Sequence, residues 1–154
     1  IIQGMETLGL RMQRHMENTH QLLNYLEQHE QVAWVRHPDL PSHPDHELAK
    51  RILPKGAGSV ITFGVKGGRD AGRIFIESVE LSSHLANVGD AKTLVIHPAS
   101  TTHSHIDAEA MKSGGLSDDM IRLSVGLEDI NDIKADFEIG FKAASRHQKL
   151  KAAE

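Results

Sequence analysis

The opening segment of the chain holds the feature that most restricts how it can fold. Residues 2–29 contain no proline, and apolar or packable side chains recur along them at a 4-3-4-3-4 spacing: Leu8, Met12, His15, Thr19, Leu22 and Leu26. This spacing places one stripe along an α-helix, so we expect a long amphipathic helix of about 25 residues. Its first turns also carry apolar residues off that stripe, namely Ile1, Ile2, Met5 and Leu10. A solvated helix end rarely exposes so much apolar surface, and we expect something outside this chain to cover it.

Runs typical of strands are intermixed with helical segments along the rest of the chain. The strand runs are residues 32–35, 59–66, 79–84, 93–97 and 121–125; the helical segments are 45–53, 70–78, 106–112 and a long one that follows Asp129 and extends through Ala144. Residues 37–44 contain three prolines, which forbid regular structure there. The strand runs are short and alternating, which favours a largely antiparallel sheet with helices on one face, an α+β arrangement.

Composition narrows the class of protein. The 154 residues amount to about one domain, and the 39% hydrophobic and 25% charged fractions are globular. A net charge of −4 provides no strong positive field, so we expect neither a nucleic-acid nor a membrane partner. The absence of cysteine excludes disulfides, thiolate nucleophiles and Cys-ligated zinc, and it fits a reducing cytoplasmic location. No apolar run reaches the ~18–20 residues that a membrane span needs.

Arg122 is the most informative single residue. Residues 121–125 alternate between apolar Ile121, Leu123 and Val125 on one face and polar side chains on the other. A guanidinium in mid-strand therefore points off the non-core face, where it is well shaped to bind a carboxylate through two parallel hydrogen bonds. The spacing alone leaves an ordinary surface ion pair equally open.

Eleven histidines raise the question of a metal site. His43 and His46 lie three apart beside acidic residues, and His103, His105 and Asp107 resemble a ligand triplet. Pro44 interrupts the first pair, and neither cluster has a partner at the spacing of a standard structural site. We therefore expect no metal, and we expect surface or hydrogen-bonded structural roles for most histidines.

The chain shows no self-contained active site. It has no Gly-x-Gly-x-x-Gly, no Walker loop and no Gly-x-Ser-x-Gly elbow. Lys55, Lys66 and Lys92 lie beside turns, and nothing marks any of them as desolvated for Schiff-base chemistry. Residues 82–103 are dense in hydroxyl, amide and imidazole groups. Such a segment either borders a ligand pocket or forms a loop whose side chains hydrogen-bond to its own backbone.

Several stretches together resemble the Cys/Met-metabolism enzymes that use pyridoxal phosphate (PLP). They are Gly4-Met-Glu-Thr-Leu8, His43-Pro44 with His46-Glu-Leu-Ala-Lys50, His97-Pro-Ala-Ser-Thr-Thr-His103 and Ile121-Arg-Leu-Ser-Val-Gly-Leu-Glu-Asp129, in the family's order over almost the whole chain. Within the family, residues 53–58 and 83–94 look most like the O-acetylhomoserine sulfhydrylase branch.

The resemblance implies the C-terminal part of a longer subunit with an aspartate-aminotransferase-like (fold type I) architecture. Residues 1–30 would be the linking helix from a larger PLP-binding domain, and residues 31–154 the small C-terminal domain, with a mostly antiparallel sheet and helices on one face. The larger domain would carry the Schiff-base lysine and most cofactor contacts. This stretch alone would then hold no catalytic residue and would be inactive.

The resemblance also implies site residues and an activity. Arg122 falls on the arginine that binds the substrate's α-carboxylate, Asn87 and Val88 fall where many relatives have Ser-Leu beside the substrate, and Thr102 falls on a pocket threonine. The implied activity is γ-replacement on O-acetylhomoserine by sulfide or a thiol, which gives homocysteine or methionine in methionine biosynthesis, by a cytoplasmic homotetramer. Cystathionine γ-synthase and methionine or cystathionine γ-lyase chemistry stay open, as does a free-standing non-catalytic module that binds an amino acid or a metal.

Overall fold

The chain folds around one four-stranded antiparallel sheet. The computed structural model describes residues 1–101 and 113–152, and the predicted helix at 106–112 lies outside these residues. The strands are β1 (Val32–Arg36), β2 (Val60–Val65), β3 (Leu94–Ile96) and β4 (Met120–Ser124), in the spatial order β1-β2-β4-β3. Every neighbouring pair is antiparallel, as predicted from the short alternating runs.

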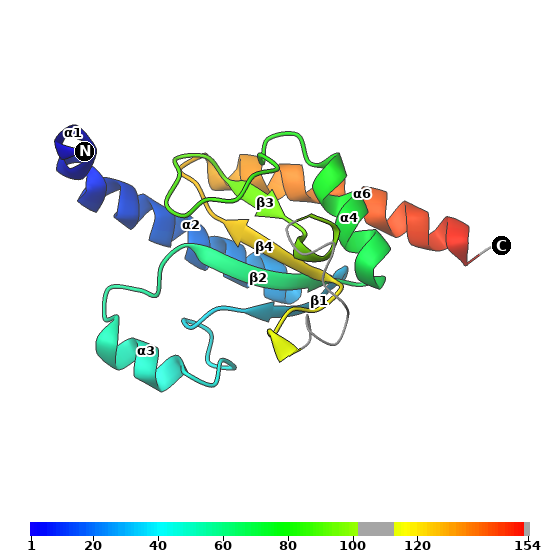
Figure 1. Cartoon of the computed structure of the whole chain (residues 1–154), viewed down its shortest axis with the longest axis horizontal. Coiled ribbons are helices and arrows are strands. Elements are labelled where there is room, and N and C mark those ends of the chain that lie inside the picture. Colours follow the sequence, from blue (N-terminus) through cyan, green and yellow to red (C-terminus); the bar gives the residue numbers. More distant parts are fainter. Residues whose placement is uncertain (102–112, 153–154) are drawn as a thin grey trace.

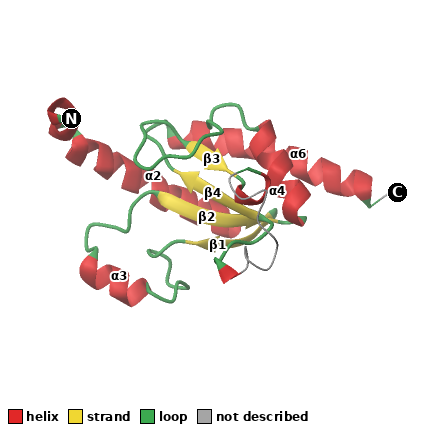
Figure 2. Cartoon of the chain, viewed as in Figure 1, coloured by secondary structure: helices red, strands yellow, loops and turns green. Residues whose placement is uncertain are grey.

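Three helices pack against one face of this sheet: α2 (Leu8–Gln28), α4 (Gly68–Ser78) and α6 (Ile130–Lys151). The opposite face, here called the open face, is turned towards the viewer in Figure 1, although Leu94, Ile96 and Ser124 on it are buried. The layers are plain when helices and strands are coloured apart (Figure 2). Four mutually contacting rings, Phe63, Phe75, Phe137 and Phe141, join β2, α4 and α6 and are at most 1% exposed. The odd-numbered residues of β2 and β4 point into this core, and Arg122 therefore projects from the opposite face.

The predicted opening helix is interrupted. A short α1 (Ile2–Glu6) ends at Thr7, and α2 begins at Leu8. No residue of α1 is buried, so packing does not offset the low helix propensity of Gly4 and Gly9 on either side of the break. The Arg11 guanidinium donates to the Gly4 carbonyl at 2.6 Å, which satisfies one of the acceptors that the break leaves over. Ile1, Ile2, Met5 and Leu10 are all exposed, as expected from the sequence.

The prediction of a strand at residues 79–84 was wrong. This segment forms a loop, and its one bridge to another described residue joins Ser83 to Leu94. The reason is the buried carboxylate of Asp136 on α6, which accepts the backbone N–H groups of Glu80, Leu81 and Ser82 at 2.6, 2.9 and 2.9 Å. Since these amides donate to a side chain, they are not available for a strand ladder.

Other local predictions are confirmed. Asp129 is the N-cap of α6, and its carboxylate accepts from the Asn131 N–H at 2.8 Å. Asp45 holds the N-cap position of α3 (His46–Ile52) without a side-chain hydrogen bond. Residues 37–44 form neither helix nor strand. None of the helices in the described ranges is long and apolar enough to cross a membrane.

Candidate functional site

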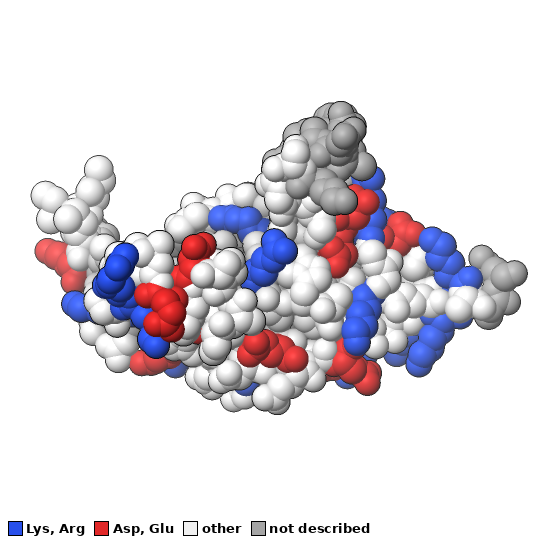
Figure 3. Space-filling model, turned by 90° about the horizontal axis from the view of Figure 1, so that it is seen from below, with Lys and Arg blue, Asp and Glu red and all other residues white. Residues whose placement is uncertain are grey.

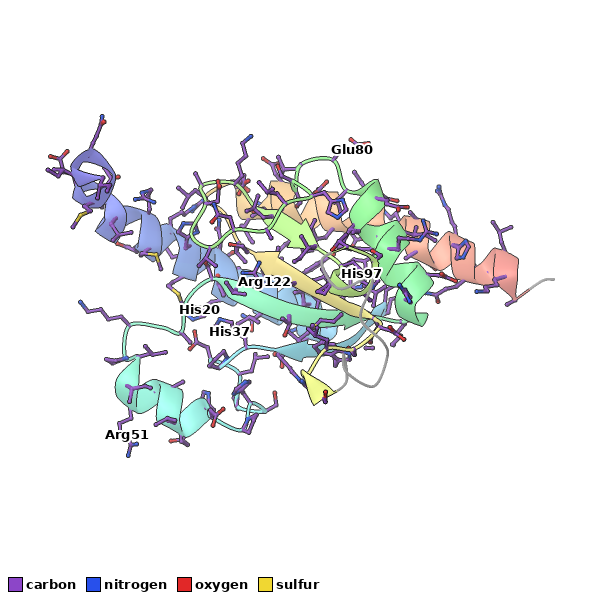
Figure 4. All side chains as sticks on the ribbon, in the orientation of Figure 1. His20, His37, Arg51, Glu80, His97 and Arg122 are labelled. Carbon is purple, nitrogen blue, oxygen red and sulfur yellow. The ribbon has the colours of Figure 1, made fainter. Side chains whose placement is uncertain are left out.

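Arg122 lies at the centre of the open face. Its neighbours across the ladder are Thr62 on β2 and Ile96 on β3. Within residues 1–101 and 113–152, no carboxylate lies within 4 Å of its guanidinium, whose Nη2 donates a long hydrogen bond of 3.4 Å to the backbone oxygen of Asn87. A partly exposed guanidinium without a carboxylate partner is suited to bind an anionic group from outside the domain. Figure 4 shows the residue at the middle of the sheet.

Asn87 approaches Arg122 through its backbone while its side chain organises the loop. Its amide Nδ2 donates to Asp90 at 3.3 Å, and its Oδ1 accepts from the Val88 N–H at 2.8 Å. Asp90 also accepts from the Lys92 N–H at 3.0 Å, and this backbone bond, followed by that from Asn87, lowers the pKa of its carboxyl. The loop is thus fixed by its own side chains, with Val88 67% exposed beside it.

The structure therefore brings two of the four predicted site residues together. Arg122 and Asn87 are in contact, although through the Asn87 carbonyl rather than its side chain. Val88 follows directly in the same exposed loop. Thr102 lies outside the described residues.

A second arginine shares the row of Arg122 on the open face. Arg36 on β1 pairs with Thr62, which in turn pairs with Arg122, so the two arginines are separated by two strand spacings, roughly 10 Å. The Arg36 guanidinium lies 5.2 Å from the centre of the Trp34 ring. It borders a cavity of about 750 Å³ beside β1, whose lining includes His43 and Ser117 but not Arg122. Sequence reasoning missed Arg36, because a strand of only five residues showed no clear alternation.

Three of the histidines in the described ranges are buried, and each lies within hydrogen-bond distance of a backbone oxygen. His15 Nδ1 lies 2.7 Å from the Val125 oxygen, and His37 and His97 each donate from Nε2 to a backbone oxygen, of Gly58 at 3.1 Å and of Asp118 at 2.7 Å. Burial lowers the pKa of both His37 and His97. These are the structural histidines that the sequence analysis expected.

Metal-binding groups do not gather in the part of the chain that the structure describes. Over residues 1–101 and 113–152, no group of three or more His, Asp or Glu side chains could hold a metal ion. His46 donates instead from Nδ1 to the Pro38 oxygen at 2.9 Å, and the His43 Nδ1 accepts from the Asp45 N–H at 3.1 Å. The second predicted cluster, at His103, His105 and Asp107, lies outside the described residues.

Comparison with known proteins decides the family. A family model described as Cys/Met metabolism PLP-dependent enzyme matches residues 1–142. The chain belongs to this family. The Cys/Met metabolism family uses pyridoxal phosphate. Arg122 on the open face is therefore part of a chain from a PLP-dependent family. The predicted resemblance is thereby confirmed.

Several family members are closely similar. The chain is 51% identical over 138 residues to O-acetyl-L-homoserine sulfhydrylase 1 of Thermus thermophilus, covering 90% of this chain and 33% of that protein. It is 51% identical over 144 residues to homocysteine synthase of Schizosaccharomyces pombe, with coverages of 94% and 34%. The chain thus spans about a third of the length of these Cys/Met metabolism relatives.

Solved structures agree with this assignment. A putative O-acetylhomoserine (thiol)-lyase from Campylobacter jejuni, which contains a pyridoxyl-lysine, superimposes with a TM-score of 0.84 at 35% identity, over 91% of this chain and 33% of that one. Cystathionine γ-lyase of Lactobacillus plantarum gives the same TM-score at 34% identity, over 93% and 37%. The α+β fold therefore matches the C-terminal portion of Cys/Met metabolism enzymes.

Proposed function

We propose that this chain is the C-terminal, substrate-carboxylate-binding part of a PLP-dependent transferase. The full enzyme replaces the acetoxy group on Cγ of O-acetylhomoserine with sulfide or a thiol, so that acetate leaves and homocysteine or methionine is formed. The observation that carries the proposal is Arg122, a guanidinium without a carboxylate partner among the described residues, in a chain 51% identical to sulfhydrylases. Residues 1–30 link a larger PLP-binding domain to a small domain of residues 31–154, and the whole is a cytoplasmic homotetramer.

The residues of this chain fit the substrate better than the cofactor. Every lysine in the described ranges is exposed or half-buried, so none has the desolvated surroundings of a Schiff-base lysine. Arg122 has the flat donor pair that a carboxylate needs. When bound to the larger domain, PLP supplies an electron sink for the amino acid. Arg122 supplies orientation, because two parallel hydrogen bonds fix both the position and the rotation of the α-carboxylate.

Replacement of Arg122 tests this role. In the full-length enzyme, we expect Arg122→Ala to raise KM for O-acetylhomoserine about 100-fold and to leave the absorbance of the cofactor unchanged. Arg122→Lys keeps the charge but loses the planar donor pair, so we expect an intermediate KM. Arg36→Ala is the matched control, since this arginine lies in the same row of the sheet. An unchanged KM in Arg122→Ala would refute the carboxylate assignment.

Two other reactions within the family have structural support of equal weight. Cystathionine γ-lyase and cystathionine γ-synthase structures superimpose with the same TM-score of 0.84 as the thiol-lyase. Assays of the full-length protein separate the reactions: O-acetylhomoserine with sulfide, O-acetylhomoserine with cysteine, and methionine or cystathionine alone. Product formation only from methionine or cystathionine would replace the sulfhydrylase proposal by a γ-lyase. Membership in the family argues against an unrelated non-catalytic module.

A further inference from the structure

His97 joins the end of one strand to the beginning of another. It directly follows β3, and its ring is completely buried. Its Nε2 lies 2.7 Å from the backbone oxygen of Asp118, two residues before β4, and its Nδ1 lies 2.8 Å from the Ser100 hydroxyl. One side chain thus connects the exit of β3, the turn that follows it, and the entrance of β4.

The chemistry of the two contacts fixes the form of the ring. A carbonyl oxygen only accepts, so Nε2 carries the proton and donates to Asp118, and Nδ1 accepts from the Ser100 hydroxyl. A neutral imidazole satisfies both contacts, and burial, which lowers the pKa of His97, favours that neutral form. The ring therefore makes two directed hydrogen bonds to the backbone and the turn without carrying charge.

Helix α4 and the turn hold His97 from the other side. An added Cβ at Gly72 would lie 2.7 Å from two atoms of the His97 ring, so the helix can approach only because this position is glycine. Arg69 of the same helix donates to the Ala99 oxygen at 2.7 Å, and the Thr101 hydroxyl donates to the His97 oxygen at 2.9 Å. The His97 ring accordingly has little freedom to move.

Arg122 depends on its strand for its position. Among residues 1–101 and 113–152, its guanidinium makes one hydrogen bond, which is 3.4 Å long and too weak to orient the group. The backbone of β4 is held by Thr62 on one side and by Ile96, the residue before His97, on the other. Asp118, the His97 acceptor, lies four residues before Arg122. A shift at the entrance of β4 would therefore be transmitted to the guanidinium.

We propose that His97 is a positioning residue for the substrate's carboxylate: by joining the end of β3 to the entrance of β4, it sets where Arg122 presents its guanidinium. The proposal rests on the proposed function, because it takes Arg122 as the group that binds the carboxylate. His97 itself touches no substrate.

The fold supplies a matched control at the other edge of the sheet. His37 directly follows β1, is 1% exposed, donates from Nε2 to the Gly58 oxygen at 3.1 Å and accepts at Nδ1 from the Asp39 N–H at 3.1 Å. Gly58 lies two residues before β2. His37 therefore joins β1 to β2 as His97 joins β3 to β4, and the two rings are similarly buried. The difference is that β1, the strand before His37, does not pair with β4, whereas β3, the strand before His97, does. Figure 4 marks both histidines.

The test compares four variants of the full-length, PLP-loaded enzyme. We expect His97→Asn, which cannot reach the Asp118 oxygen, to raise KM for O-acetylhomoserine about tenfold with kcat within twofold. His97→Gln restores a donor at the Nε2 position and should return KM to within about twofold of the wild type. His37→Asn should lower the urea midpoint but leave KM unchanged. If His97→Asn does not fold, Ser100→Ala, which removes only the Nδ1 partner, should still raise KM about threefold.

Hydrogen exchange and substrate turnover together separate the positioning role from the proposed function. We expect His97→Asn to speed exchange of the amides of residues 119–122 and to leave residues 32–36 of β1, which does not pair with β4, unchanged, and His37→Asn to do the reverse. Wild-type enzyme that turned over no amino-acid substrate would overturn the proposed function, whatever the exchange pattern. Normal KM in His97→Asn and in Ser100→Ala, in an enzyme that does turn over O-acetylhomoserine, would overturn the positioning role alone. Unchanged exchange at residues 119–122 would overturn it too.

Discussion

At the scale of the residue, Asp136 shows how one buried carboxylate decides the course of a loop. It is 4% exposed and accepts three successive backbone N–H groups from residues 80–82. In Asp136→Asn, the amide nitrogen would face at least one of these N–H donors. We expect the variant to lose about 2 kcal/mol of unfolding free energy, measured from the urea midpoint.

Asp132 on the same helix is the control for this change. It is exposed and belongs to the first turn of α6. Asp132→Asn should alter the unfolding free energy by less than about 0.5 kcal/mol. Equal effects of the two substitutions would mean that the carboxylate of Asp136 does not hold the loop.

At the scale of the element, the packing of α4 on α6 depends on a glycine. An added Cβ at Gly140 would lie 2.7 and 2.9 Å from two atoms of the Phe75 ring, which is completely buried among aromatic neighbours. Alanine normally stabilises a helix interior by about 1 kcal/mol relative to glycine. Here we expect the crowding to win, and Gly140→Ala to destabilise the protein by about 1–3 kcal/mol in urea unfolding.

Gly9 provides the opposite case in α2. Nothing lies within 4 Å of an added Cβ at this position. Gly9→Ala should therefore leave the urea midpoint unchanged or raise it slightly, since only the helix propensity changes. A rise in stability for Gly140→Ala as well would show that the helices separate easily.

At the scale of the whole molecule, the buried histidines make stability depend on pH. Burial lowers the pKa of His37 and His97 below the ordinary value of 6.5. Below that pH the unfolded chain binds protons that the folded chain excludes, so the unfolding free energy decreases as the pH falls from 7.5 towards 5.5. Each histidine contributes a slope of up to about 1.4 kcal/mol per pH unit.

His37→Gln isolates this effect, because glutamine can donate to the Gly58 oxygen without titrating. We expect its urea midpoint to depend less on pH than that of the wild type over the range 7.5 to 5.5. Carboxylates such as Glu138, whose pKa is lowered first by the Tyr25 hydroxyl, lose their contribution only below their ordinary value of 4.5. Parallel pH profiles for wild type and variant would contradict the assignment to His37.

On the face that Figure 3 shows, charge is distributed without a dominant sign. The face in Figure 3 carries lysine, arginine, aspartate and glutamate side chains interspersed along its length. Lysines and carboxylates also form ion pairs: Lys151, at the end of α6, lies 2.8 Å from the carboxylate of Asp70 on α4. This mixture agrees with the small net charge of −4. We therefore expect the proposed binding of a carboxylate at Arg122 to depend on the local guanidinium rather than on a broad positive field.

Sequence patterns predicted the elements whose signals are local. The alternation at residues 121–125 predicted both a strand and the face of Arg122, and Asp129 predicted the start of α6. The errors occurred where distant residues compete for the backbone. Residues 79–84 have the composition of a strand, but the carboxylate that binds their amides is more than 50 positions away. The break at Thr7 was missed because a stripe of apolar residues does not report whether anything packs against it.

By itself, the amino-acid sequence determined the family, the antiparallel α+β class and the arginine on the open face, because periodicity, caps and motifs are properties of neighbouring residues. Only the tertiary structure decided which backbone groups the buried side chains bind. Nothing in the sequence distinguishes His97 and His37 from the other histidines. In the folded chain each connects two strands through a hydrogen bond to a backbone carbonyl 21 positions away. A buried donor must find an acceptor wherever the folded chain brings one, and the sequence does not display that pairing.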